Sequence, residues 1–186
     1  MVPDDHERSG APGDLEEVRT LLNSWNVPND TRIPRDQLSE WSADERVWND
    51  LFHTVPRPRR PAEVDRLARA RDIVRALVDG NPDPFEAMIA DEHRPAIRIA
   101  EGRLAFDADS SAVGRVVSIV LAAAAEGTLG RLRACGDCAW VFYDSSRNNR
   151  RRWCAMIPSP GVRGCGSAAK AREYRSRHRP GAVIEA

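Results

Sequence analysis

The hydrophobic residues of the first 130 positions follow mainly a helical period. Apolar side chains three and four residues apart share one face of an α-helix, and such stretches are separated here by proline and glycine. The pattern predicts helices at 14–27, 36–41, 42–52, 61–78, 84–93 and 109–127. Pro61 suits a first helical turn and Gly80 the position after a last turn, so the longest helix is expected between them.

Two of these helices begin with the pattern of a capping box. Asp14 is followed three residues later by Glu17, and Ser42 by Glu45. The core faces are expected to hold Leu15, Val18, Leu21, Leu22, Trp25, Val47, Trp48, Leu51, Phe52, Val64, Leu67, Val74, Leu77 and Val78. Trp25, Trp41 and Trp48 are most simply core residues, with the lining of a ligand pocket as the alternative.

The period changes to two at 96–107, where apolar and polar residues alternate around Glu101-Gly102, which predicts a β-hairpin. Two further short strands are predicted at 131–134 and 139–143, with Trp140 and Phe142 on one face. A final helix is expected from Ala168 to His178, capped by Gly166-Ser167. The fold class is therefore mainly α, with a helical N-terminal domain that carries one hairpin and a small, treble-clef-like C-terminal module.

All four cysteines of the chain lie in this C-terminal module. Cys135, Cys138, Cys154 and Cys165 have the spacing Cys-x2-Cys, then 15 residues, then Cys-x10-Cys. Four thiolates in two pairs are typical of a structural Zn²⁺ site, which folds its segment and leaves no coordination position open for catalysis. A Cys-x-x-Cys redox pair and two disulfides are the alternatives, and the absence of any export signal argues against the second.

The formal net charge of zero hides an asymmetry between the two parts. Residues 1–130 carry 16 arginines and 24 acidic residues, whereas residues 131–179 carry 12 basic and three acidic residues. A small basic module of this kind predicts a polyanionic partner, with double-stranded DNA as the leading candidate. The alternative is a basic face that docks on an acidic partner protein or on the acidic N-terminal domain.

Other features limit the possible functions. No nucleophile and base pair is recognisable, and His53 and His93 are interpreted as surface or capping residues, so the protein is not expected to be an enzyme. Neither a signal peptide nor a membrane-spanning segment is recognisable, which predicts a cytoplasmic protein without membrane contact. Residues 1–13 are expected to be disordered, and the Pro-Arg-Pro-Arg-Arg-Pro segment at 56–61 is interpreted as a surface linker.

The C-terminal sequence resembles the CGNR zinc finger. The likeness rests on Cys135-x-x-Cys138 with the following Ala-Trp-Val-Phe-Tyr-Asp-Ser-Ser-Arg-Asn, on Arg-Arg-Arg-Trp-Cys-Ala-Met at 150–156, and on the segment from Cys165 to Arg175. In bacterial proteins regarded as stress-induced transcription regulators this finger follows an ABATE domain, which Leu21-Leu22-Asn23-Ser24-Trp25 resembles more weakly. The resemblance implies a division into 14–130, an ABATE-like domain, 131–179, the finger, and 180–186, a tail.

The sequence departs from the family pattern at two places. Ser167 and Ala168 stand where the family motif has Asn and Arg, and 157–164 is an insertion rich in proline and glycine. All four thiols remain, so zinc binding is still expected, and the predicted function is that of a zinc-dependent DNA-binding transcription regulator. The expected nucleic-acid contacts are Arg147, Asn148, Asn149, Arg150, Arg151, Arg152, Lys170, Arg172, Arg175 and Arg177. A further alternative is that the helical domain senses a small-molecule effector and the finger relays the signal.

Overall fold

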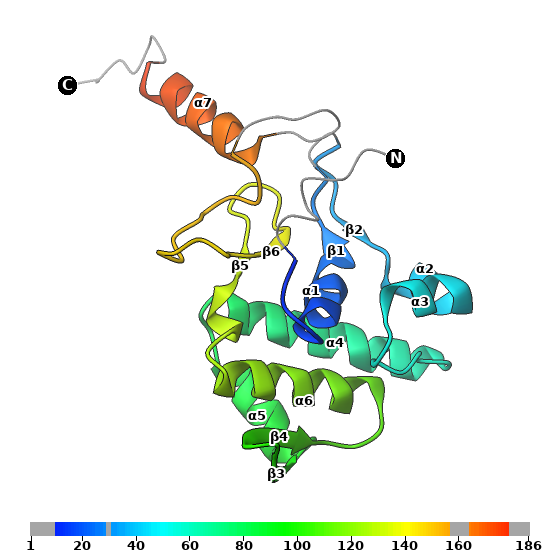
Figure 1. The fold of residues 1–186 in the computed structure, drawn as a ribbon. Coiled ribbons are helices and arrows are strands. Elements are labelled where there is room, and N and C mark those ends of the chain that lie inside the picture. Colours follow the sequence, from blue (N-terminus) through cyan, green and yellow to red (C-terminus); the bar gives the residue numbers. More distant parts are fainter. Residues whose placement is uncertain (1–9, 29–30, 157–163, 179–186) are drawn as a thin grey trace, which may run out of the picture.

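Three helices pack against one another at the centre of the molecule: α1 (Leu15–Asn23), α4 (Pro61–Val78) and α6 (Ala112–Ala125). In this computed structural model, which describes residues 10–28, 31–156 and 164–178, α4 and α6 run side by side below α1 (Figure 1). Their contact faces supply most of the large side chains that are shielded from solvent, among them Val18, Leu21, Leu22, Leu67, Val74, Val116, Val117 and Val120. This three-helix core is the platform on which the C-terminal module lies.

The remaining elements surround this core. The helices are α2 (Leu38–Ala43), α3 (Glu45–Leu51), α5 (Asp83–Asp91), the 3-10 turn η2 (Leu129–Arg131) and α7 (Cys165–Arg177). The antiparallel strand pairs are β1 (Trp25–Asn26) with β2 (Arg35–Asp36), β3 (Ala96–Ala100) with β4 (Arg103–Asp107), and β5 (Leu132–Ala134) with β6 (Val141–Tyr143). Figure 1 shows α7 projecting from the end of the molecule opposite β3 and β4.

Several predictions from the pattern are confirmed. The longest helix is α4, with Pro61 in its first turn, and the hairpin β3–β4 turns at Glu101-Gly102. Both turn residues have positive φ, 51° and 77°, as a two-residue hairpin turn of this hand requires. Within the described residues, no helix combines the length and apolar content needed to cross a membrane. The predictions for 1–9, the tail and most of the insertion lie outside the described residues.

The first helix differs from its prediction at both ends. It ends at Asn23 instead of near Pro28, because the chain enters the short strand β1, and Trp25 is only half-buried there. The side chain of Asp14 makes no capping bond and instead forms an ion pair with Arg115. Glu17 is buried, and its carboxylate accepts the backbone amides of Thr54 and Val55 at 2.9 Å each. Glu17 therefore ties a distant loop to α1 instead of completing a capping box.

Two other helix starts are corrected. The cap of α3 is Asp44 and not Ser42, since the Asp44 carboxylate accepts the amides of Arg46 and Val47. The last helix begins at Cys165, three residues earlier than predicted, and the hydroxyl of Ser167 donates to the carbonyl of Gly164. Cys165, the last of the four cysteines, is thus the first residue of a helix, which fixes the direction of its side chain.

The C-terminal module is fused to the helical core through buried polar contacts. The side chain of Asn23, at the end of α1, accepts the amide of Val141 at 2.7 Å and donates to its carbonyl at 2.8 Å, as a neighbouring strand would. Arg75 on α4 donates to the carbonyl of Ala139 at 2.7 Å. Leu132 and Val141 also belong to the same hydrophobic cluster as the three central helices. The two parts of the chain consequently share one core.

Replacing Asn23 with Ala should strongly destabilise the folded protein. The substitution leaves the amide of Val141 buried without a partner and its carbonyl with only the Arg19 guanidinium group, at 3.4 Å, which lowers the free energy of unfolding by about 2 kcal/mol. Urea denaturation measures this change, with Asn81→Ala, at an exposed position after α4, as the control that should change it by less than about 0.5 kcal/mol. Equal losses in the two variants would contradict the role given to Asn23.

Candidate metal centre and its basic surroundings

The hairpin β5–β6 separates the helical core from the cysteine cluster. Its strands pair Leu132 with Tyr143 and Ala134 with Val141. Because successive strand residues point to opposite faces, Val141 packs into the helical core whereas Phe142 and Trp140 pack against the cysteines, as the alternation predicts. The hairpin therefore packs against the helical core with one face and against the cysteine cluster with the other.

The turn of this hairpin carries the first two cysteines. The amide of Cys135 donates to the carbonyl of Trp140 at 2.8 Å, and the amide of Ala139 donates to the carbonyl of Cys135 at 2.9 Å. Ala139 takes the left-handed conformation, with φ of 58°, which closes the turn within so few residues. This tight knuckle directs the thiols of Cys135 and Cys138 to the same side.

The other two cysteines approach from a loop and from a helix. Cys154 follows the arginine-rich loop, whose backbone is joined to the knuckle by the bond from the Gly136 amide to the Arg152 carbonyl, at 3.2 Å. Cys165 opens α7. The amide of Gly166 donates to the carbonyl of Ala155 at 3.0 Å, so the start of α7 is held against the residues that follow Cys154.

The four sulfur atoms form a compact, buried group. All lie within 4.8 Å of one another, and the Sγ atom of Cys138 is 3.6 Å from those of Cys154 and Cys165, which are themselves 3.7 Å apart. A tetrahedral zinc site with bonds of about 2.3 Å has sulfur–sulfur edges of about 3.8 Å. A disulfide requires about 2.05 Å, and all four cysteines are free. The geometry therefore suits one four-coordinate cation and excludes the alternative of two disulfides in this structure.

The pKa values of the cysteine thiols also indicate a cation at this site. Hydrogen bonding to Cys138, Cys154 and Cys165 lowers the pKa of Cys135 far below that of an ordinary thiol. Hydrogen bonds with Cys135 raise the pKa values of Cys138 and Cys154. Alone, the cluster thus favours one thiolate stabilised by neighbouring thiols, because several negative charges this close repel one another. A divalent cation is what would allow all four sulfurs to be thiolates at neutral pH.

Asp137, inside the knuckle, links the cluster to its surroundings. Its side chain is almost fully buried and pairs with Arg172 on α7 and, at 3.6 Å, with Arg32 from the helical part. Arg32 also donates to the carbonyl of Asp137 at 2.8 Å. One buried carboxylate therefore fixes α7 and the segment before β2 to the same turn.

The arginine-rich loop between β6 and Cys154 is folded around Asp144. This buried carboxylate accepts the amides of Ser146 at 2.9 Å and Arg151 at 2.8 Å. Burial alone would raise the pKa of Asp144, but these hydrogen bonds and the Arg151 charge outweigh it, so the pKa is lowered. Asp144 therefore stays ionised at neutral pH and holds the loop in a fixed shape.

The structure divides the predicted nucleic-acid contacts into two groups. One group has structural partners. Arg151 lies over the ring of Phe142 and donates to the carbonyl of Cys154 at 2.6 Å, and the side chain of Asn149 donates to the carbonyl of Gly130 at 2.9 Å. Arg172 pairs with Asp137 and Arg177 with Glu173. Arg151, Asn149 and Arg172 thus connect different segments of the module, whereas the Arg177 pair lies within one turn of α7.

The second group is exposed and has no acidic partner within the described residues. It consists of Arg147, Asn148, Arg150, Arg152, Lys170 and Arg175, from the arginine-rich loop and from α7. The guanidinium group of Arg152 lies over the ring of Trp153, 5.2 Å from its centroid, which limits the directions in which it can point. We call the five basic residues of this group the outer cations.

Sequence reasoning missed the residues that connect the finger to the helical part. Asn23, Arg32, Arg75 and Asp137 all make polar contacts between the two parts. Only two of these residues stand out in the sequence. Asn23 lies at the apolar end of a predicted helix, and Asp137 lies between two cysteines. Neither feature identifies the partner in the other part of the chain, which is more than 60 residues away in each of these contacts between the two parts.

His93 was also interpreted incompletely. Its Nδ1 atom lies 2.7 Å from the carboxylate of Asp109, so it has a specific partner although no pairing was recognisable in the sequence. His53 is exposed, as expected. Of the three N-terminal tryptophans, Trp48 is buried and Trp25 and Trp41 are half-buried, and the Trp48 indole donates to the Val55 carbonyl at 3.0 Å.

Comparison with known proteins agrees with the geometry. Residues 131–178 match the family model described as the CGNR zinc finger. No curated protein matches the chain. Together with the four-cysteine cluster, the match indicates a zinc-binding module at the C-terminal side of the helical core.

Gly166, the glycine of the CGNR motif, lies where Met156 leaves no room for a side chain. A Cβ atom there would lie 2.2 Å from the Met156 sulfur and 3.3 Å from its Cα, so Gly166→Ala forces the side chain and the backbone of Met156 to move. We expect the free energy of unfolding of the zinc-loaded protein to fall by about 1–2 kcal/mol in urea titrations.

A matched control is available within the knuckle. At Gly136 the added Cβ would meet only the carbonyl of Arg152, at 3.9 Å, so Gly136→Ala should change stability little. Adding Met156→Ala to Gly166→Ala should recover part of the loss. A control as damaging as Gly166→Ala would show that the contact with Met156 is not the cause.

Proposed function

We propose that the protein is a zinc-dependent DNA-binding protein and a bacterial transcription regulator. Cys135, Cys138, Cys154 and Cys165 are the proposed zinc ligands, and the helical part is proposed to be an ABATE-like domain. The main support is that one buried four-cysteine cluster fixes both carriers of the outer cations, because Cys154 ends the arginine-rich loop and Cys165 begins α7.

The outer cations fit a phosphate backbone better than they fit a protein partner inside the same chain. The side-chain contacts that join the finger to the helical part are made by residues of the helical part, such as Arg75, Arg32 and Asn23, with backbone groups and one carboxylate of the finger. The outer cations take no part in this joint and remain exposed. This arrangement argues against docking of the basic surface on the acidic N-terminal domain.

The outer cations are proposed to contact the phosphates of the DNA backbone. Phosphate contacts position a protein on DNA, and contacts to base edges supply specificity. Asn148 is exposed, directly follows Arg147 and is the candidate for a base contact, whereas the side chain of Asn149 donates to the carbonyl of Gly130. Zinc would act only by holding the surface in shape, so no catalytic role is proposed.

Duplex binding should depend on salt and on the outer cations. With five cations on phosphates, log affinity should fall against log salt concentration with a slope of about −4.5, and the triple variant Arg150→Gln, Lys170→Gln, Arg175→Gln should reduce the slope to about −2. Fluorescence anisotropy with a labelled duplex of random sequence measures both slopes.

The control removes the same charge from the helical part. Arg46→Gln, Arg66→Gln, Arg69→Gln changes three exposed residues of α3 and α4 and should leave the slope unchanged. Zinc removal by a chelator should abolish binding by the native protein. Absent binding at low salt, or equal effects of the two triple variants, would disprove the proposal.

A further inference from the structure

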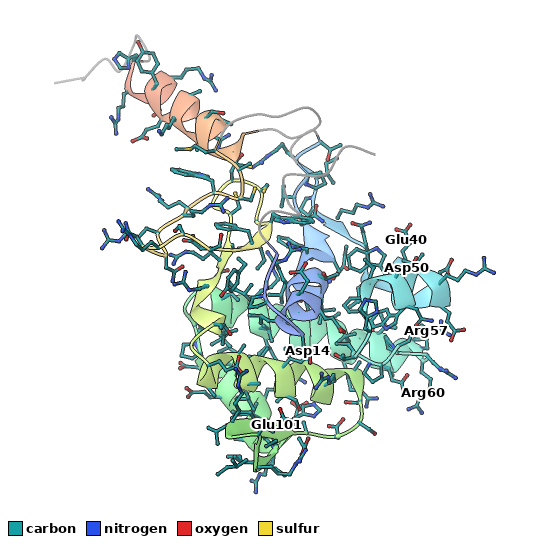
Figure 2. All side chains as sticks on the ribbon, viewed as in Figure 1. Asp14, Glu40, Asp50, Arg57, Arg60 and Glu101 are labelled. Carbon is teal, nitrogen blue, oxygen red and sulfur yellow. The ribbon has the colours of Figure 1, made fainter. Side chains whose placement is uncertain are left out.

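The hairpin β3–β4 projects from the helical part and exposes an apolar face. Every residue of β3 is exposed, and β4 packs against α6, so β3 is the outer strand. Figure 2 shows Glu101, at the turn of this hairpin, at the end of the molecule opposite α7. The register places Ile97 opposite Phe106 and Ile99 opposite Leu104. These four apolar side chains therefore share one face of the hairpin.

Most of this apolar face is open to solvent. Ile97 is 66%, Ile99 80% and Leu104 50% exposed, and they are three of the seven large apolar side chains that are exposed in the described part of the chain. The other face of the hairpin is polar, with an ion pair between Arg98 and Asp107. A single exposed apolar residue is ordinary, whereas several side by side indicate an interaction surface.

The outer edge of β3 also offers unpaired backbone groups. Both turn residues have positive φ, so Ala100 and Arg103, which flank the turn, are expected to exchange hydrogen bonds. Bonded pairs then alternate along the ladder, so the amides and carbonyls of Ile97 and Ile99 point away from β4. Among the described residues no other strand pairs with this edge. A free edge of this kind can accept another strand.

The edge of β3 is complementary to itself. When two copies pair antiparallel about a two-fold axis at Arg98, Ile97 of one copy lies opposite Ile99 of the other, and each such pair exchanges both of its backbone hydrogen bonds. An axis at Ile97 would place Pro95, which has no amide hydrogen, opposite Ile99. An axis at Ile99 would place the turn residue Glu101 opposite Ile97. Only the axis at Arg98 uses all the outward backbone groups.

The charges at the two ends of β3 fit the same arrangement. Arg94 precedes the strand and Glu101 follows it, and neither pairs with an opposite charge among the described residues. Antiparallel pairing brings Glu101 of each copy beside Arg94 of the other, whereas parallel pairing would bring like charges together. The two Arg98 side chains meet near the axis, but each has Asp107 of its own chain as a counter-charge.

We propose that the edge of β3 is a homodimer interface at which two copies of this chain form one continuous antiparallel sheet. Contacts between Ile97 of one copy and Ile99 of the other shield part of the exposed apolar face. One five-residue strand per copy buries less than the roughly 800 Å² per partner of a stable dimer, so we expect a dissociation constant of about 10–100 µM.

The proposed dimer leaves both zinc fingers accessible. The hairpin and α7 lie at opposite ends of the molecule, so the joint at β3 is remote from the basic surface (Figure 1). The proposal concerns the helical part alone and does not depend on DNA binding by the finger.

Sedimentation equilibrium of the full-length, zinc-loaded protein without DNA tests this interface. Between about 2 and 300 µM protein, the average mass should rise from that of one chain towards that of two. Ile99→Lys should raise the Kd of the dimer at least about tenfold, because it places a charge of each copy within the apolar contact. Ile33→Lys is the control, since Ile33 is also an exposed isoleucine but lies outside the hairpin, and it should leave the Kd unchanged.

Exchanging the end charges tests the antiparallel arrangement. Arg94→Glu and Glu101→Arg each bring like charges together at both ends of the pairing, and each should raise the Kd about fivefold. The double variant restores opposite charges and should return the Kd to within about twofold of the native value. Comparable Tm values of the variants confirm that they fold.

Three results would overturn the proposal. The first is the mass of a single chain at all concentrations up to about 300 µM. The second is a dimer that Ile99→Lys weakens no more than Ile33→Lys does. The third is a double charge variant that dimerises no better than the single variants. DNA binding is measured on separate samples, so the two proposals can fail independently.

Discussion

Four sulfur atoms within 4.8 Å of one another place a charge constraint on the whole C-terminal segment. Without a metal ion, several thiolates at such distances would repel one another. Four neutral thiols avoid this repulsion, but they do not form the strong bonds that thiolates form with a metal ion. A divalent cation removes this conflict. The loop that carries Arg147, Arg150 and Arg152 and the helix that carries Lys170 and Arg175 both end or begin at cysteines of the cluster, so their positions depend on it.

The finger is also held from the other side by the helical core. Asn23 completes the edge of β6, and Arg75 bonds the knuckle at Ala139. In each case a side chain of the helical part satisfies a backbone group of the finger that burial has removed from water. The two parts therefore behave as one folded body in this structure, although their compositions and charges differ. The helix α4 takes part in both regions, because Leu67 and Val74 pack in the helical core and Arg75 near its end contacts the finger.

Much of this arrangement could be predicted from the sequence. Helical periodicity located α4 and α6, period-two alternation located β3–β4 and the two faces of β6, and cysteine spacing identified the cluster. These features depend on residues close together in the chain, where geometry fixes which side chains share a face. The capping box at Asp14 was predicted wrongly because tertiary partners compete for the same carboxylates, and the one at Ser42 because Asp44, two residues later, caps α3 instead. Asp14 pairs with Arg115 and Glu17 binds the loop at Thr54, and neither partner can be recognised locally.

The polar contacts between distant segments could not be predicted for the same reason. Nothing in the sequence shows that Asp137 pairs with Arg32 and Arg172, or that His93 pairs with Asp109. The arginine-rich stretches were recognised as basic, but the sequence could not distinguish Arg151, which supports the loop, from Arg150, which is exposed. A charge count therefore gives the sign of the expected partner, whereas the structure gives the residues that are free to meet it.

X-ray absorption at the zinc edge of the purified protein tests the role of the cysteine cluster most directly. One zinc per chain with four sulfur neighbours at about 2.3 Å, and no nitrogen or oxygen in the first shell, is the predicted result. A folded protein without zinc, or a zinc ion whose first shell contains fewer than four sulfurs, would contradict it.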